Sequence, residues 1–299
     1  MMAAVTFDRI ALVVHPSRDL RRALATVEAW AAEQEAELVQ LDVPGQEQRI
    51  APEGEPGTCD LVVALGGDGT TLAALHAAAP ADRPVLGVAC GSLGALTAVT
   101  ADRLDAALGR VAAGDWTARR LPGLAVEADG GRRTVAVNDL VLVRAGAGQV
   151  AIEIVVDGER FIRYAGDGLV AATPLGSTAY TLAAGGPMLA PGAAGLVLTP
   201  LAAHGGVCPP LVTPAGACVE VRLSPGHGGA RLEVDGRIAV ELARMEDVAL
   251  ALAFVEEHAT LVSLGDQEPL IAGLRRRRII LDSPRMLARD DREAARAKA

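Results

Sequence analysis

The sequence predicts an α/β domain with a doubly wound parallel sheet, followed by a mostly β, sandwich-like domain. Two observations support this prediction. In residues 1–118, short runs whose apolar residues are continuous rather than alternating are separated by helical patterns, as in parallel strands covered on both faces. In residues 119–265, short β-rich runs follow one another with little helical periodicity.

The first domain alternates strands and helices. The expected strands are residues 10–14, 38–43, 61–65 and 84–88. The expected helices are residues 17–37, 70–79 and 102–114. We expect Ser17 to cap the first helix, Thr70 and Thr71 to cap the second, and Gly114 to end the third.

The second domain is built from short strands and tight turns. The expected strands are residues 134–143, 150–156, 217–223, 230–234, 237–242 and 248–254. Asp129-Gly130, Asp157-Gly158 and Asp235-Gly236 lie between such runs and are typical of hairpin turns. We expect the remaining residues, 266–299, to complete the first domain.

Composition excludes several classes of function. A formal net charge of −9 argues against a protein that mainly holds nucleic acid, and an aromatic content of 2% leaves few residues for base stacking. The four cysteines form no C-x-x-C pair, which favours reduced thiols in the cytoplasm over disulfides or a zinc site. The N-terminus lacks the pattern of a secretion signal.

Residues 168–219 contain no Asp, Glu, Lys or Arg. Glycines and prolines interrupt this stretch, so no continuous apolar helix of about 20 residues exists and we expect no membrane span. We interpret the stretch as buried in the fold or covered by a partner subunit.

Residues 66–70 read Gly-Gly-Asp-Gly-Thr and stand between an expected strand and an expected helix. In α/β proteins ligands bind at this kind of crossing. Gly66, Gly67 and Gly69 would let backbone N–H groups approach a phosphate, which the helix N-terminus also favours. The carboxylate of Asp68 would then hold Mg²⁺ or accept a proton from an attacking hydroxyl. The plain alternative is a solvated aspartate in a tight turn.

This motif resembles one shared by NAD kinases, diacylglycerol-type lipid kinases and phosphofructokinases. Further segments are similar to the NAD kinases in particular, and they occur in that family's order. These segments are VNDLVLVR (137–144), GDGLVAATPLGSTAYTLAAGGPMLAP (166–191), LVLTPLAAH (196–204) and EVDGR (233–237). The ordered set is far more specific than the first motif alone.

The resemblance implies a role for each matching residue. Asp68 would act on the 2′-hydroxyl of the adenosine ribose, with Asn138 and Asp139 lining the same site. Asp167 would reach the nicotinamide half from a neighbouring subunit. The residues implied to contact adenine and ribose are Thr178, Ala179 and Tyr180.

The resemblance also implies the reaction: phosphoryl transfer from ATP or inorganic polyphosphate to NAD, giving NADP. Mg²⁺ or another divalent metal would accompany the phosphates, with Asp68 as a possible ligand and no certain metal site. The implied assembly is a homodimer or homotetramer with shared active sites. Two alternatives stay open, a lipid kinase with the same first motif and a non-catalytic dinucleotide sensor.

The sequence departs from the family pattern around the expected acceptor pocket. Ala89 replaces the usual Asn, Ala95 an aromatic residue and Ala183 a common serine. We therefore expect an acceptor pocket that is larger and less polar, with the phosphotransfer residues intact. This pattern does not distinguish among NAD, NADH and other acceptors.

Overall fold

The structure is a computed structural model that describes residues 6–46, 48–128, 131, 133–242, 247–265 and 269–297. The chain forms two compact units, the first ending at Leu264 and the second beginning at Gly265. The turn expected at Asp129-Gly130 lies outside the described residues.

A parallel sheet opens the first unit, in the spatial order β2-β1-β3-β4. Its strands are β1 (Arg9–Val14), β2 (Glu37–Gln40), β3 (Leu61–Gly66) and β4 (Pro84–Ala89), with a short β5 (Val99–Thr100) beside β4. The four expected strands are confirmed, although β2 ends three residues earlier than the apolar pattern indicates.

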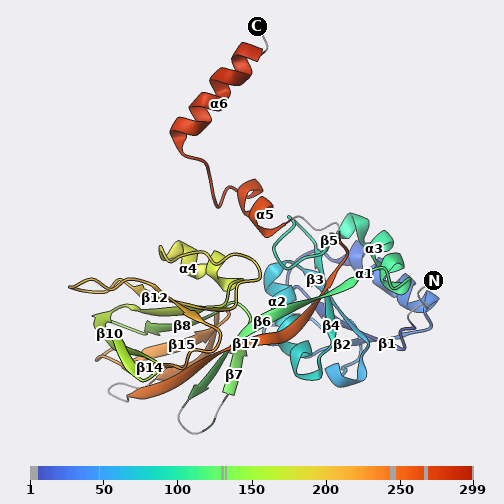
Figure 1. The fold of residues 1–299 in the computed structure, drawn as a ribbon. Coiled ribbons are helices and arrows are strands. Elements are labelled where there is room, and N and C mark those ends of the chain that lie inside the picture. Colours follow the sequence, from blue (N-terminus) through green and yellow to red (C-terminus); the bar gives the residue numbers. More distant parts are fainter. Residues whose placement is uncertain are drawn as a thin grey trace. The chain divides into compact units, whose positions relative to one another are not determined.

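Helices cover both faces of this sheet. Two helices, α1 (Arg21–Glu33) and α3 (Leu104–Ala112), contribute to the core that contains Ile10 of β1. Helix α2 (Asp68–Ala78) packs on the other face, where Leu75 lies in one core with Ala11 of the same strand. The expected doubly wound arrangement is confirmed (Figure 1).

A two-sheet sandwich makes up the mostly β part, as expected. Its strands are β7 (Arg133–Ala136), β8 (Asp139–Arg144), β9 (Val150–Val156), β10 (Glu159–Gly166), β11 (Gly168–Ala172), β12 (Gly195–Leu201), β13 (Leu211–Pro214), β14 (Val219–Ser224), β15 (Ala230–Val234) and β16 (Arg237–Leu242). One sheet has the order β13-β12-β11-β8-β15-β16, and its inward side chains, such as Leu142, share a core with Ile154 and Val221 of the other sheet.

Two long strands join the parallel sheet to the sandwich. Strands β6 (Thr117–Ala128) and β17 (Val248–Ser263) pair antiparallel over nearly their whole length (Figure 1). The first five residues of β17 pair with β14 of the sandwich, whereas Thr260 and Leu261 pair in parallel with β4. The parallel sheet and one layer of the sandwich are therefore a single continuous sheet.

Two helix starts differ from the expectation. Helix α1 begins at Arg21, and the carboxylate of Asp19, not Ser17, accepts the backbone N–H of that residue at 3.1 Å. Helix α2 begins at Asp68, so Thr70 and Thr71 lie inside its first turn instead of capping it. The hydroxyl of Thr71 donates to the carbonyl of Gly67 at 3.0 Å.

The hairpins that are described follow the expectation. Asp157-Gly158 joins β9 to β10, and Asp235-Gly236 joins β15 to β16, with positive φ at all four residues. The run 134–143, expected as one strand, is instead two strands, because the chain leaves the sheet at Val137 and Asn138.

The charge-free stretch 168–219 forms β11, β12, β13 and the short helix α4 (Tyr180–Ala183). Strand β11 lies inside its sheet, and Leu169 and Val170, which face opposite sides, are 1% and 0% exposed. Burial on both faces explains the lack of charge in this strand. Among the described helices, none is long and apolar enough to cross a membrane.

The smaller elements complete the description. Short 3₁₀ turns cover Pro56–Thr58, Ala79–Ala81, Ala101–Arg103 and Gly176–Thr178. The second unit contains α5 (Leu270–Arg276) and α6 (Pro284–Ala297), and within it Arg275 forms an ion pair with Asp282.

The first residue of β8, Asp139, carries a buried carboxyl group. It is 6% exposed. Burial and the neighbouring carboxylates of Asp235 and Glu233 raise the pKa of Asp139 from 3.8 to about 7. Between pH 3.8 and about pH 7, the folded protein therefore keeps a proton on Asp139 that the unfolded chain has released.

We predict that this carboxyl makes the protein less stable as the pH rises. Its contribution to the free energy of unfolding is fully present below about pH 4 and is lost by about pH 7. Between these values the free energy of unfolding falls by up to about 1.4 kcal/mol per pH unit. Asp139→Asn imitates the protonated form, so the variant should match wild type near pH 4 and exceed its unfolding free energy at pH 8. Denaturant melts across this range check the prediction, and parallel pH profiles for the two proteins would contradict it.

Candidate functional site

The Gly-Gly-Asp-Gly-Thr segment forms the expected crossing from a strand to a helix. Gly66 ends β3, and Asp68 is the first residue of α2. A Cβ atom on Gly66 would lie 2.2 Å from the hydroxyl oxygen of Thr70, so this glycine lets the first helical turn pack on the strand end. A Cβ atom on Gly69 would meet open space, so this glycine leaves the backbone accessible.

Backbone groups of a neighbouring loop hold the carboxylate of Asp68. The N–H groups of Ala95 and Leu96 donate to its two oxygens, both at 2.9 Å. A Cβ atom on Gly94 would lie 2.0 Å from one of these oxygens, so only glycine fits there. The side chain of Asp68 is thus fixed at the start of α2.

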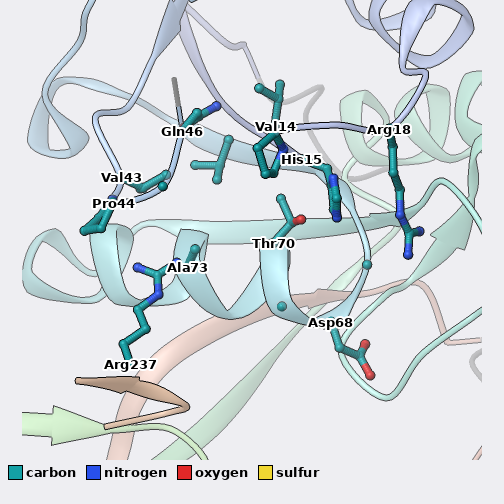
Figure 2. Close-up of a pocket in the computed structure, with 15 residues that line it drawn as sticks. Val14, His15, Arg18, Val43, Pro44, Gln46, Asp68, Thr70, Ala73 and Arg237 are labelled. Carbon is teal, nitrogen blue, oxygen red and sulfur yellow. The ribbon is translucent and has the colours of Figure 1, made fainter. Parts of the chain in front are cut away.

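A cavity of about 360 Å³ opens beside this carboxylate, at the carboxyl ends of β1 and β3 (Figure 2). Its walls come from the segments after β1 and β2, from the start of α2 and from Arg237 of β16. The lining residues that Figure 2 labels are Val14, His15, Arg18, Val43, Pro44, Gln46, Asp68, Thr70, Ala73 and Arg237.

Two arginines give this cavity a positive lining. Arg18 donates to the carbonyl of Gly66 at 3.2 Å, and Arg237 lies on the other side of the first turns of α2 (Figure 2). The N-terminus of an α-helix itself attracts anions through its free N–H groups. The cavity therefore suits a multiply charged anion next to Asp68.

The Asn138 segment and the loop after β11 lie together. Thr173 donates its backbone N–H to the carbonyl of Asn138 at 2.9 Å and its hydroxyl to that of Val137 at 2.7 Å. A Cβ atom on Gly176 would lie 1.9 Å from the carbonyl oxygen of Asn138, so the glycine is needed for this close contact. The structure thus brings two of the sequence motifs into one place.

The residues after Gly176 form the surface of this loop. The hydroxyl of Thr178 donates to the carbonyl of Leu175 at 2.9 Å, Ala179 is exposed, and Tyr180 is 44% exposed. Ser177, in contrast, is fully buried between the carbonyl of Pro174 and the N–H of Leu189. Ser177 therefore has a structural role, whereas Thr178, Ala179 and Tyr180 are available to a ligand.

Asp167 lies at the other end of β11 from these residues. It forms an ion pair with Arg144 at 2.7 Å, and both side chains are partly exposed. Asp167 and Thr173 are six positions apart along β11, which corresponds to about 20 Å. Within one chain, Asp167 is thus well separated from Asn138.

Sequence reasoning missed several residues that shape this region. Asp235 was expected only as a turn residue and His76 was not assigned a role, yet their side chains contact each other at 2.5 Å. Arg18 and Arg237 were not identified as cavity residues. The sequence does indicate that Asp235 has a role, since this residue lies in the EVDGR segment that resembles the NAD kinases.

The departures from the family pattern fall in different environments. Ala89 is 1% exposed at the end of β4, so this replacement affects packing and not a pocket surface. Ala95 is half-buried beside Asp68, and Ala183 is exposed in α4. Of the three, Ala95 is the position that bears on the site around Asp68.

Comparison with protein families agrees with this geometry. The ATP-NAD kinase N-terminal domain matches residues 12–116, and the ATP-NAD kinase C-terminal domain matches residues 137–261. Among curated relatives, the NAD kinase of Gemmatimonas aurantiaca is 36% identical over 71% of this chain and 70% of its own length. The NAD kinase of Heliobacterium modesticaldum is 35% identical over 78% of this chain and 81% of its own length.

Solved structures share the fold. Yeast NADH kinase, crystallised with NADH, has a TM-score of 0.77 and 22% identity over 93% of this chain and 89% of its own. An NAD kinase from Archaeoglobus fulgidus in complex with ATP has a TM-score of 0.66 and 22% identity over 87% and 94%. The resemblance of the ordered motifs is confirmed: the chain belongs to the NAD kinase family and is a kinase that transfers phosphate to NAD.

Proposed function

We propose that Asp68 is the base of this reaction. The 2′-hydroxyl oxygen of the adenosine ribose attacks the terminal phosphorus of the donor, the bond from that phosphorus to the bridging oxygen breaks, and Asp68 accepts the hydroxyl proton. The observation that supports this role is the fixed carboxylate at the start of α2, held by two backbone N–H groups beside a cavity with two arginines.

We propose that the cavity holds the phosphoryl donor and that the donor is ATP. Arg18 and Arg237 supply positive charge for a triphosphate. Val43 and Pro44 add an apolar wall on which a purine can lie. A polyphosphate chain has no apolar part to use this wall, which favours a nucleotide.

A divalent metal fits this arrangement as a companion of the donor. Within the described part of the chain, no group of three or more His, Cys, Asp or Glu side chains could hold a metal ion by itself. Mg²⁺ is commonly bound by one or two carboxylates together with substrate phosphates, and Asp68 is the carboxylate that lines the cavity. When bound, the ion would neutralise charge on the phosphates.

We propose that the acceptor lies against Asn138, Asp139 and the surface formed by Thr178, Ala179 and Tyr180. The contact between Gly176 and the carbonyl of Asn138 joins these two segments into one surface. The amide of Asn138 can bond ribose hydroxyls, and the ring of Tyr180 offers a face for stacking. The alternatives of a lipid kinase and a dinucleotide sensor are not favoured by the family matches.

We also propose that the protein is a homodimer or homotetramer in the cytoplasm, where a partner's Asp167 completes each site. The separation of about 20 Å within one chain supports a contribution from a neighbouring copy. The four cysteines are all free, which fits a reducing compartment. The two family matches support the division into domains at residue 118, and we propose that residues 266–299 complete the first.

Asp68→Asn should lower kcat about a hundredfold or more, because the amide cannot accept the proton. The dissociation constant for NAD should change far less, since binding relies on other residues. Coupled NADP assays and NAD titrations on the purified variant check this. Asp115→Asn, which alters an exposed ion pair after α3, serves as the matched control. Turnover close to wild type in folded Asp68→Asn protein would exclude the role of base.

Mixing inactive Asp68→Asn and Asp167→Ala proteins should restore part of the activity. In a mixed oligomer, one site would combine an intact Asp68 with an intact Asp167 from the partner. Mixing Asp68→Asn with Asp68→Ala provides the control, because neither protein can supply the missing base. No recovery in the first mixture, or a fully active monomer in sedimentation, would rule out shared sites.

Ala95→Phe should lower the KM for NAD roughly 2- to 10-fold with a smaller change in kcat, since a stacking ring contributes about 0.5–1.5 kcal/mol. The backbone N–H that Ala95 donates to Asp68 is unaffected by the change of side chain. Steady-state kinetics with NAD, NADH and a panel of nucleosides measure the effect. Loss of NAD activity alone would indicate a bulkier natural acceptor. Loss with every acceptor would show that a neighbouring side chain already fills the space.

A further inference from the structure

The buried carboxylate of Asp235 gathers hydrogen bonds from three consecutive backbone N–H groups. Its side chain is 1% exposed. The N–H groups of Val137, Asn138 and Asp139 donate to it at 2.8, 2.7 and 2.9 Å. In return, the N–H of Asp235 donates to the carbonyl of Asp139 at 2.9 Å. The segment that carries Asn138 is therefore fixed to the β15–β16 turn by one side chain.

Helix α2 provides a further donor to the same carboxylate. His76 Nε2 lies 2.5 Å from Asp235 Oδ2, and the imidazole is 28% exposed. His76 follows Asp68 by about two helical turns, or about 12 Å along the axis. Since a short helix moves as a rigid rod, a contact at His76 also fixes where Asp68 stands.

The surroundings of this pair are strongly charged. His258 of β17 interacts with both His76 and Asp235, and Arg133 lies within reach of His258. Asp139 and Glu233 are further acidic groups in this region, and the carboxylates of Asp235 and Glu233 help raise the pKa of Asp139. A buried carboxylate among other acids is costly without donors, so Asp235 depends on the backbone N–H groups and on His76.

We propose that His76 and Asp235 are positioning residues that set the distance between Asp68 and the acceptor bound at Asn138. Asp235 holds the Asn138 segment, and His76 ties this segment to the helix that begins with Asp68. This proposal rests on the proposed roles of Asp68 and Asn138. A misplacement of about 1 Å between reacting groups can cost on the order of a hundredfold in rate.

Three substitutions of His76 separate positioning from simple stability. His76→Gln places an amide N–H near the position of Nε2 and keeps the hydrogen bond. His76→Lys places a positive charge beside Asp235 but does not reproduce the geometry. His76→Ala removes both. His227→Ala, in the exposed loop between β14 and β15, is the matched control.

The readouts are kcat and KM for NAD, the melting temperature, and hydrogen exchange at the amides of residues 137–139. We expect His76→Ala to lower kcat tenfold or more, to change KM less than threefold and to speed exchange at these amides. His76→Gln should stay within threefold of wild type in kcat. His76→Lys should melt near the wild-type temperature yet turn over at least fivefold more slowly.

The outcomes decide the proposal even if His76→Ala does not fold, because the Gln and Lys variants then carry the comparison. Lys and Gln variants with equal, wild-type kcat would overturn it, as would a Gln variant as slow as the Lys variant. These results are distinguishable from a failure of the proposed function. That failure would appear as an active Asp68→Asn protein, whatever the His76 variants do.

Discussion

A buried carboxylate must find hydrogen-bond donors, and this requirement at Asp235 organises the centre of the molecule. Four donors from two parts of the chain meet there: the N–H groups of residues 137–139, and the imidazole of His76. Each of these groups belongs to an element with a proposed function, either the helix of Asp68 or the segment of Asn138. The β15–β16 hairpin, which itself holds no reacting group, thereby joins the two halves of the site.

Much of the fold follows from local patterns in the sequence. Apart from Arg9 at the start of β1, strands β1, β3 and β4 contain only apolar residues, because helices cover both faces of the sheet. The Asp-Gly pairs between β9 and β10 and between β15 and β16 form turns with the positive φ that these residues tolerate. The pattern fails where other constraints dominate. Strand β6, TARRLPGLAVEA, contains arginines, a proline and a glycine, and it is a strand because β17 pairs with it along its length.

The candidate site likewise contains residues that the sequence predicts and residues that it does not. Asp68 stands out in the sequence because glycines surround it between a strand and a helix, and the structure gives it that position. His76 and Asp235 could not be paired from the sequence, since they lie far apart in the chain and meet only through the tertiary fold. Likewise, Arg237 enters the cavity because the hairpin turns back toward α2, which no local pattern shows.

Strand β17 pairs both with β14 of the sandwich and with β4 of the parallel sheet, and this has a consequence for the synthesis of the protein. Strand β4 pairs in parallel with residues 260–261, and these residues leave the ribosome long after β4 does. The parallel sheet therefore emerges with an open edge at β4, which stays exposed until β17 has been made. Such an edge favours association with other nascent chains. In this protein, β17, the last strand of the sheet in chain order, is thus also the strand that covers the edge of β4.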